Sequence, residues 1–143
     1  MDFSFTEEQE LLAENLVEFM DREYPESLIK ECDEQKIFPV EANKKFYEAG
    51  FGAIGVPEEL GGVPADMVTM CLVTSIVYRY SWAGCTYSPL SIMNAADKAS
   101  PEIRTEMLEG LMSGEKRHSF GNTEPGAGSD AAGIKTSYKK VDG

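Results

Sequence analysis

The chain has 143 residues, of which 42% are hydrophobic and 27% are charged, a balance typical of one globular domain with its own core. Its formal net charge of -12 disfavours binding to nucleic acids and to anionic lipid surfaces, because both are negatively charged. The composition therefore predicts a soluble protein with an acidic surface, with neither nucleic acid nor membrane among its partners.

The cysteines and the single histidine do not form a metal-binding pattern. Cys32, Cys71 and Cys85 are far apart in the sequence, and His118 is the one histidine. No CxxC pair is present, so no metal site is predicted and the cysteines are interpreted as buried, reduced thiols. The acidic N-terminus is neither a signal nor a transit peptide, and no apolar run approaches the length of a membrane span. We expect a cytoplasmic location.

Helix signals begin at the N-terminus with the stretch FTEEQELLAENLVEFMDREY. Thr6 can cap a helix, and Gln9 three residues later can complete a capping box. Apolar residues then recur at helical spacing on one face, with acids on the other. We predict an amphipathic helix over about residues 6–21, with a buried face of Leu12, Leu16 and Phe19 or Met20.

Proline and glycine divide the next part of the chain. Residues 25–38 are polar and can hold a short helix, and a second clear helix is expected between Pro39 and Gly50. The glycine- and proline-rich stretch over residues 51–66 predicts a loop. Its expected apolar anchors are Phe51, Ile54 and Val56.

Three further helices are predicted before residue 117. Residues 67–80 are apolar nearly all round, which favours a central, buried helix. Another helix starts near Pro89, and a last one has Ser100 and Pro101 at its start and Gly114 at its end. The expected buried residues of that last helix are Ile103, Met107, Leu108 and Leu111.

The pattern changes after residue 117. The stretch HSFGNTEPGAGSDAAG is not helical, and IKTSYKKV is rich in residues that favour strands. The dipeptide at residues 142–143, Asp-Gly, is typical of a hairpin turn. We therefore predict a mainly α protein, with a helical domain over residues 1–117 and the truncated start of a β domain over residues 118–143.

The octapeptide TEPGAGSD, residues 123–130, has the composition of a ligand-binding loop. Gly126 and Gly128 let a flat or anionic ligand approach the main chain, and Thr123 and Ser129 add hydroxyl groups. Exposed N–H groups in such a turn can hold an oxyanion or a ring carbonyl. The stretch is neither a P-loop nor a dinucleotide fingerprint. From the residues alone, a tight connection between a helical and a β region stays open as an alternative.

Three titratable side chains near this loop are not interpreted as catalytic. The spacing of Glu124 and Asp130 says nothing about their geometry, so both are taken as capping or solvated acids. His118 has no recognisable Ser or Cys partner pattern and is expected at the start of a strand.

Three blocks of sequence, in order, resemble the acyl-CoA dehydrogenase family. FTEEQELL over residues 5–12 is similar to the family's first helix, and FYEAGFGAIGVPEELGG over residues 46–62 to its characteristic helix and loop. LEGLMSGEKRHSFGNTEP over residues 108–125 resembles the family's helix, Ser-Gly-Glu turn and first β strand, and it runs into the signature TEPGAGSD. Together these blocks extend over essentially the whole chain.

The resemblance implies that residues 120–129 lie against FAD. The Thr123 hydroxyl and the backbone of this stretch would bond the polar edge of the flavin ring, and Phe120 would touch flavin or substrate. Gly128 and Ser129 would lie near the pyrophosphate and the CoA part of the substrate. Asn122 departs from the family, which usually has a small or β-branched apolar residue there, although its backbone N–H can still reach the flavin. Ala99, Ser100 and Pro101 depart from the family pattern in a way that looks structural.

The implied function is α,β-dehydrogenation of an acyl-CoA, or reduction of an enoyl-CoA, with FAD as the cofactor. In the family the catalytic glutamate comes from a C-terminal helical domain, so no catalytic residue is assigned here. The complete enzyme is expected to be a homo-oligomer, with some similarity to crotonobetainyl-CoA reductases. This chain alone is expected to be inactive, to bind FAD weakly or not at all, and to expose an apolar face. A non-catalytic helical module for folding or interaction is the alternative function.

Overall fold

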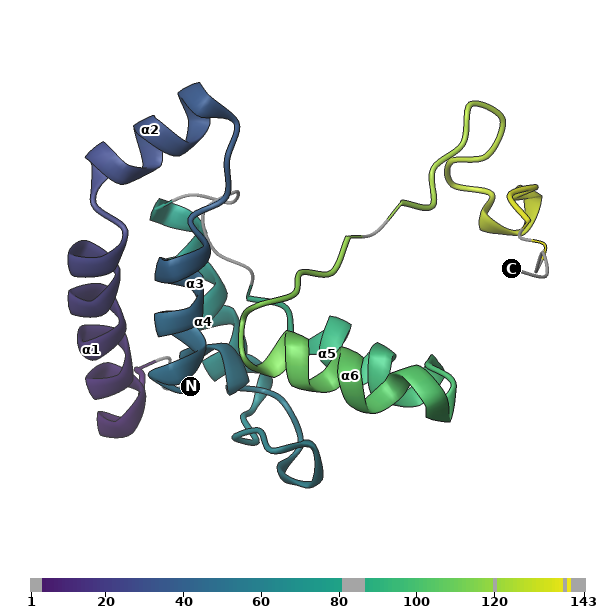
Figure 1. Cartoon of the computed structure of the whole chain (residues 1–143). Coiled ribbons are helices and arrows are strands. Elements are labelled where there is room, and N and C mark those ends of the chain that lie inside the picture. The colour runs from purple at the N-terminus through teal and green to yellow at the C-terminus, as the bar shows by residue number, and fades with distance from the viewer. Residues whose placement is uncertain (1–3, 81–86, 120, 138, 140–143) are drawn as a thin grey trace.

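The computed structural model describes residues 4–80, 87–119, 121–137 and 139, and these residues are mainly helical (Figure 1). The helices α1 and α4 pack against each other, and so do α5 and α6. None of the helices in the described part of the chain is long and apolar enough to cross a bilayer. The helices are α1 (Glu7–Glu23), α2 (Glu26–Gln35), α3 (Val40–Glu48), α4 (Met67–Tyr80), α5 (Pro89–Lys98) and α6 (Pro101–Met112).

The predicted capping box at the start of α1 is confirmed. The Thr6 hydroxyl accepts from the Gln9 backbone N–H at 3.2 Å, and the Gln9 side-chain oxygen accepts from the Thr6 N–H at 3.1 Å. The Gln9 amide also donates to the Thr69 hydroxyl at 3.1 Å, which ties the start of α1 to α4. Leu16, Phe19 and Met20 are buried as predicted.

Phe46 of α3 lies at the centre of the core and is fully buried. Its ring centroid lies 5.9 to 6.4 Å from those of Tyr47, Phe51, Phe19 and Tyr87, which come from α3, the following loop, α1 and the segment just before α5. Such aromatic pairs contribute about 0.5–1.5 kcal/mol each beyond their buried area. The core therefore joins segments from both ends of the helical region.

The loop between α3 and α4 is compact, with two 3₁₀ turns, η1 (Phe51–Ala53) and η2 (Glu58–Leu60). The Gly55 N–H donates to the Val63 carbonyl at 2.8 Å, and the Val63 N–H donates to the Ala53 carbonyl at 3.0 Å. The predicted anchors are confirmed for Ile54 and Val56, which are buried, and Phe51 is half-buried against the core.

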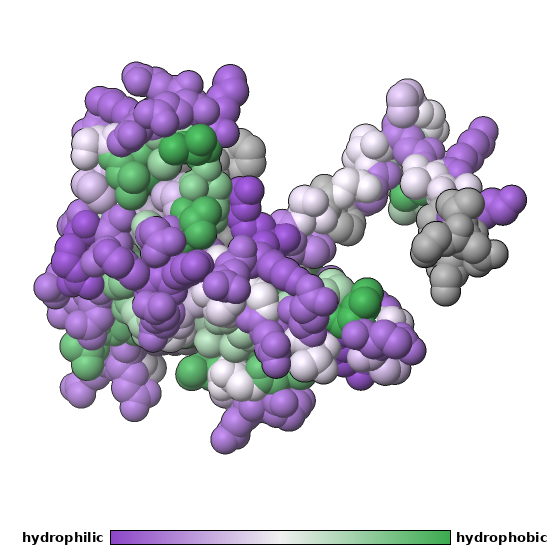
Figure 2. All heavy atoms as spheres, viewed as in Figure 1, coloured by the Kyte–Doolittle hydropathy of each residue, from purple (hydrophilic) through white to green (hydrophobic). Residues whose placement is uncertain are grey.

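The expectation that α4 is buried all round is wrong. Val73, Ile76 and Val77 are buried, but Met67 is 68% exposed and Val68 52% exposed. An apolar composition shows that a face can be covered, but it does not show which element covers it. Hydrophobic side chains also reach the surface elsewhere, below α2 and near the turn between α5 and α6 (Figure 2).

Two further expectations on burial need correction. In α6 Leu111 is buried and Met107 and Leu108 are half-buried, but Ile103 is 49% exposed. Cys32 is buried, and burial raises the pKa of its thiol, but Cys71 is exposed on the open face of α4. Cys85 lies outside the described residues.

The segment after residue 117 forms no strand in the part that the structure describes. It contains an isolated antiparallel bridge between Glu124 and Ala127 and a 3₁₀ turn, η3 (Ala131–Gly133). The backbone N–H groups of Lys135 and Thr136 donate to the Glu124 carboxylate, so this segment does not pair with a strand. Tyr138, Val141 and the expected turn at residues 142–143 lie outside the described residues, and the domain division at residue 117 stays a prediction.

Candidate functional site

The base of the candidate loop is fixed by a buried contact with α3. The side-chain amide of Asn43, which is fully buried, donates to the Gly114 carbonyl at 2.8 Å. Gly114 has a φ of +72°, and a Cβ there would lie 2.9 Å from the Asn43 carbonyl oxygen. Only glycine fits this position, which explains why α6 ends here as predicted.

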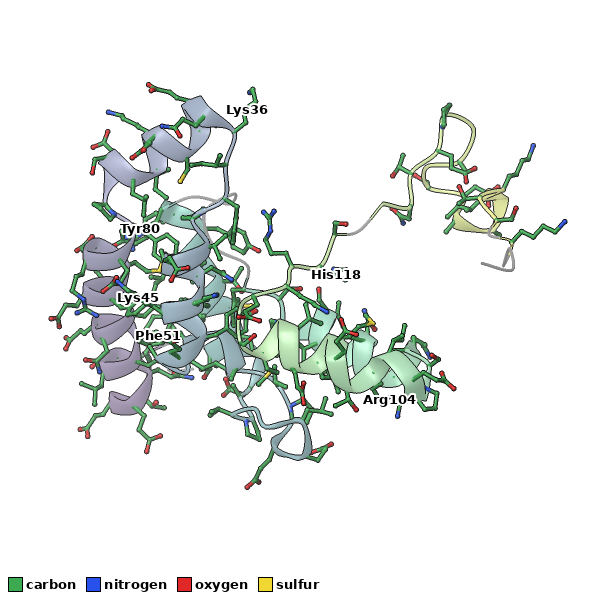
Figure 3. The ribbon with its side chains drawn as sticks, viewed as in Figure 1. Lys36, Lys45, Phe51, Tyr80, Arg104 and His118 are labelled. Carbon is green, nitrogen blue, oxygen red and sulfur yellow. The ribbon has the colours of Figure 1, made fainter. Side chains whose placement is uncertain are left out.

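Three more contacts hold residues 115–118 against the helical body. The Lys44 ammonium lies 3.4 Å from the Glu115 carboxylate, and the Arg117 guanidinium lies 3.9 Å from the centre of the Phe38 ring. His118 Nδ1 and the Ser91 hydroxyl of α5 are hydrogen-bonded at 2.9 Å. Beyond His118 the chain extends away from the helices (Figure 3). His118 therefore anchors the base of the loop, and it is not at the start of a strand in the described residues.

The tip of the loop is a tight turn. The Glu124 N–H donates to the Ala127 carbonyl at 3.0 Å, and the Ala127 N–H donates to the Glu124 carbonyl at 3.1 Å. Ala127 is 3% exposed, although its neighbours Gly126 and Gly128 are exposed. The turn therefore has a small buried contact of its own, away from the main core.

The Glu124 carboxylate joins this turn to residues 135–136. One oxygen accepts from the Lys135 N–H at 3.0 Å, and the other accepts from the Thr136 N–H at 2.7 Å and from the Thr136 hydroxyl. The Thr136 hydroxyl and these two N–H groups lower the pKa of Glu124 below its ordinary value of 4.5. Of the two interpretations left open for Glu124, a capping or a solvated acid, these bonds favour the capping one.

The predicted cofactor contacts lie on one stretch of this loop and are exposed. Thr123 Oγ1 donates to the Asn122 side-chain oxygen at 3.5 Å, and both residues are exposed. Gly128 and Ser129 are exposed on the other side of the Glu124–Ala127 turn. Because Asn122 is exposed here, its amide carries no burial penalty. Phe120, the remaining predicted contact, lies outside the described residues.

Three glycines of the loop differ from Gly133 and from the described glycines of the helical body, each of which has a close contact at its Cβ position or a positive φ. A Cβ built on Gly121, Gly126 or Gly128 meets no heavy atom within 4 Å, and none of the three has a positive φ. By contrast, a Cβ on Gly62 would lie 2.3 Å from the Val56 carbonyl oxygen. Neither backbone conformation nor packing in the described chain explains these three loop glycines.

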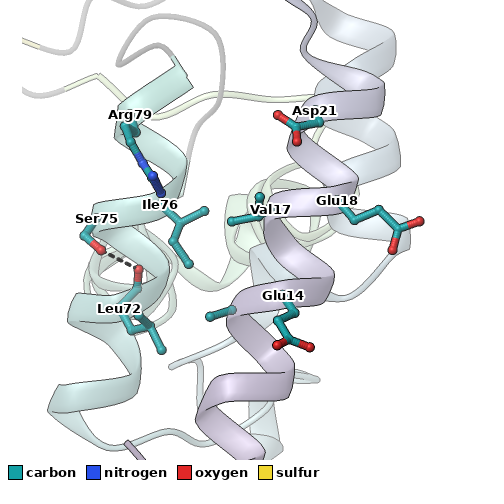
Figure 4. Close-up of a pocket in the computed structure, with 9 residues that line it drawn as sticks. Glu14, Val17, Glu18, Asp21, Leu72, Ser75, Ile76 and Arg79 are labelled. Atoms are coloured by element: carbon teal, nitrogen blue, oxygen red, sulfur yellow. Dashed lines mark hydrogen bonds between the residues drawn. The ribbon is translucent and has the colours of Figure 1, made fainter. Parts of the chain in front are cut away.

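The sequence analysis missed a groove between α1 and α4, with a volume of about 610 Å³ (Figure 4). Its floor is apolar, with Val17 of α1 and Ile76 of α4 facing each other, and acids of α1 and Arg79 form its rim. At one end the Tyr80 hydroxyl donates to the Asp21 carboxylate at 2.7 Å, and burial together with this bond raises the pKa of Tyr80 to about 12. None of the predicted site residues lines this groove.

Metal-ligand side chains do not gather elsewhere in the described residues. No group of three or more His, Cys, Asp or Glu side chains there is placed to hold a metal ion. The candidate site is therefore the loop over residues 121–136, with hydroxyls, open glycines and exposed backbone rather than a metal-binding set.

The protein-family model for the acyl-CoA dehydrogenase N-terminal domain matches the sequence over residues 6–115. These residues are the helical part of the chain and its junction with the loop. The chain belongs to the acyl-CoA dehydrogenase family. It is similar to the probable acyl-CoA dehydrogenase YdiO of Escherichia coli K12, with 32% identity over 145 residues and coverage of the whole chain. The same protein from Escherichia coli O6:H1 and O157:H7 matches with the same identity and coverage. The chain spans 38% of the length of these curated relatives. No solved structure matches the chain.

Proposed function

We propose that this chain is the N-terminal part of an FAD-dependent acyl-CoA dehydrogenase or enoyl-CoA reductase, acting on the α,β carbon–carbon bond of a CoA thioester. The observation that carries the proposal is the loop at residues 122–129. Exposed hydroxyls there accompany two glycines, Gly126 and Gly128, for which the described residues give no reason to be glycine, either from packing or from a positive φ. A ligand that lies on the backbone supplies such a reason.

The residues of the loop fit the polar parts of FAD. The Thr123 hydroxyl and backbone N–H groups, including that of Asn122, would donate to the flavin ring's polar edge, and Phe120 would touch flavin or substrate. Gly128 would allow close approach of the pyrophosphate, and Ser129 would contact both this region and the CoA part of the substrate. Bound FAD would supply the hydride acceptor, while the protein supplies orientation and electrostatics.

No side chain of the loop is assigned as the catalytic base. Both oxygens of Glu124 already accept hydrogen bonds from residues 135–136, and Glu115 is paired with Lys44. In the family the base is a glutamate of the C-terminal helical domain. The chain alone is therefore proposed to hold part of a flavin site and to be inactive, and the complete enzyme to be a cytoplasmic homo-oligomer that takes acyl-CoA or enoyl-CoA substrates.

A second candidate function is a non-catalytic helical module for folding or interaction. The observation that favours it is the exposure of apolar side chains on separate helices, including Met67 at 68% and Leu90 at 63%. An exposed apolar surface of this kind often marks an interface. The two candidates differ in whether the loop at residues 122–129 recognises flavin.

A fluorescence titration of FAD tests the proposed function. We expect weak binding by the chain, without retention of yellow colour through gel filtration, because the family's site also uses later β strands and a neighbouring subunit. Thr123→Val and Gly128→Ala should weaken this binding, whereas Glu115→Gln, at the base of the loop, should leave it unchanged. Binding that neither loop variant alters would favour the second candidate.

A further inference from the structure

The loop over residues 122–136 is closed by one side chain. The Glu124 carboxylate accepts from the Lys135 N–H, 11 residues further on, and from the N–H and hydroxyl of Thr136. Both carboxylate oxygens take part, and two of the three donors belong to the backbone. Hydrogen bonds to an ionised acceptor are stronger than neutral ones, so this arrangement opposes the entropy of an open loop.

The contact that closes the loop also restrains the segment that carries the groups proposed to meet the cofactor. Thr123 directly precedes Glu124, and Gly128 and Ser129 lie within the closed segment. Two backbone hydrogen bonds between Glu124 and Ala127, of 3.0 and 3.1 Å, hold a tight turn within the same segment. Contacts within the loop, without any helix, therefore restrain the residues on both sides of the Glu124–Ala127 turn.

We propose that Glu124 is a positioning residue, whose carboxylate closes the loop before FAD arrives and so presents Thr123 and Ser129 together. The inference rests on the proposed function for the identity of the ligand. Closing the loop in advance removes the entropy cost of ordering it on binding, which raises affinity without adding a contact to the ligand.

The groups around the Glu124 carboxylate indicate that this side chain, and not another acid of the loop, holds the loop closed. The groups that hold its carboxylate are neutral donors, and it forms no ion pair among the described residues. Asp130, the other carboxylate of the loop, lies instead beside Gly133, where its Oδ2 atom is 2.8 Å from the position of a Cβ. The two acids are therefore not interchangeable, and Asp130 offers a matched control.

The first experiment follows amide hydrogen exchange of Lys135 and Thr136 without any flavin. Glu124→Gln removes the charge and turns one acceptor into a donor, so exchange at both amides should rise by about tenfold or more. Thr136→Val should raise it less, and Thr136→Ser, which keeps the hydroxyl, should match the unchanged chain. Asp130→Asn should also leave both amides protected.

The second experiment titrates the same variants with FAD. We expect Glu124→Gln to weaken binding by about tenfold, with Thr136→Ser and Asp130→Asn close to the unchanged chain. If exchange rises in Glu124→Gln while its FAD affinity stays the same, the positioning role is overturned and the proposed function stands. If the unchanged chain shows no FAD binding, the positioning role falls together with the proposal that this chain by itself holds part of a flavin site. If Glu124→Gln does not alter exchange, the closure by Glu124 is overturned irrespective of flavin.

Discussion

The side-chain amide of Asn43 is hydrogen-bonded to the carbonyl oxygen of Gly114, 71 residues further along the chain. This single buried bond connects α3 to the residue where the chain turns from helix into the candidate loop. Asn43→Leu would leave the Gly114 carbonyl buried without this donor. We expect a loss of about 1–3 kcal/mol in the free energy of unfolding, measured by urea denaturation.

Lys44→Ala provides the neighbouring control for that measurement. It removes the 3.4 Å ion pair with Glu115, which is 62% exposed, so the change should stay below about 1 kcal/mol. Equal losses in the two variants would contradict the assignment of stability to the Asn43–Gly114 bond.

The glycines allow a direct comparison of two positions. Gly114→Ala places a Cβ 2.9 Å from the Asn43 carbonyl oxygen at a φ of +72°, and we expect it to cost at least about 1–2 kcal/mol. Gly128→Ala meets no heavy atom within 4 Å, so the thermal unfolding midpoint should be unchanged or slightly raised. A clear loss of stability in Gly128→Ala would show that the loop glycine is needed by the fold.

The loop should open at low pH. Because the pKa of Glu124 is lowered below 4.5 in the folded loop, its contribution is present above that value and is lost as the pH falls through the lowered pKa. The amide resonances of Lys135 and Thr136 should therefore shift with a midpoint below pH 4.5. Thr136→Val removes the largest cause of the shift, so its midpoint should lie closer to 4.5. A midpoint above 4.5 in the unchanged chain would contradict the closed loop.

Two phenols, of the half-buried Tyr80 and the buried Tyr87, should make the helical body sensitive to alkali. Burial raises the pKa of Tyr80 and of Tyr87 from 10 to about 12, and each hydroxyl donates a hydrogen bond, to Asp21 and to the Ile54 carbonyl respectively. Because the neutral phenol is favoured in the fold, this stability is complete below pH 10 and declines as the pH rises towards 12. Denaturation measured across this range should show a smaller decline for Tyr80→Phe than for the unchanged chain.

Exposed apolar side chains predict binding of a hydrophobic dye. Met67 is 68% exposed and Leu90 63% exposed, so Met67→Gln and Leu90→Gln together should lower dye fluorescence and any self-association of the chain. Neither change should alter the urea midpoint, because both side chains already contact water. Strictly monomeric elution with no dye binding by the unchanged chain would contradict this surface.

Local signals in the sequence predicted the helices well. Thr6 and Gln9 form the expected capping box, Pro101 stands in the first turn of α6, and Gly114 follows its end. Such signals act between residues a few positions apart, so they can be recognised without knowledge of the tertiary structure. The family signature at residues 123–130 was likewise legible as a local motif.

Contacts between distant residues could not be predicted. Ile103 carries the apolar character of a core residue, but in the described structure its side chain is 49% exposed. The stretch after Ile134 has strand propensity, yet its backbone donors are taken by Glu124. The Ser91–His118 bond joins residues 27 positions apart that share no motif. Secondary-structure propensity indicates which structures a segment can form. Which of them it forms depends on the segments that are available to pair or pack with it.

The glycines of the chain fall into two groups, those required by the fold and those that we propose are required by the ligand. Substitutions at Gly62 or Gly114 would place a Cβ against backbone atoms, so a screen for folded protein should select against them. Substitutions at Gly121, Gly126 or Gly128 should not be selected against in the same screen, because no heavy atom of the described residues lies within 4 Å of their Cβ positions. A library of variants sorted once by abundance and once by flavin binding should therefore place these two groups of glycines in different sets. The positions that change only in the second sorting would trace the outline of the ligand on the loop.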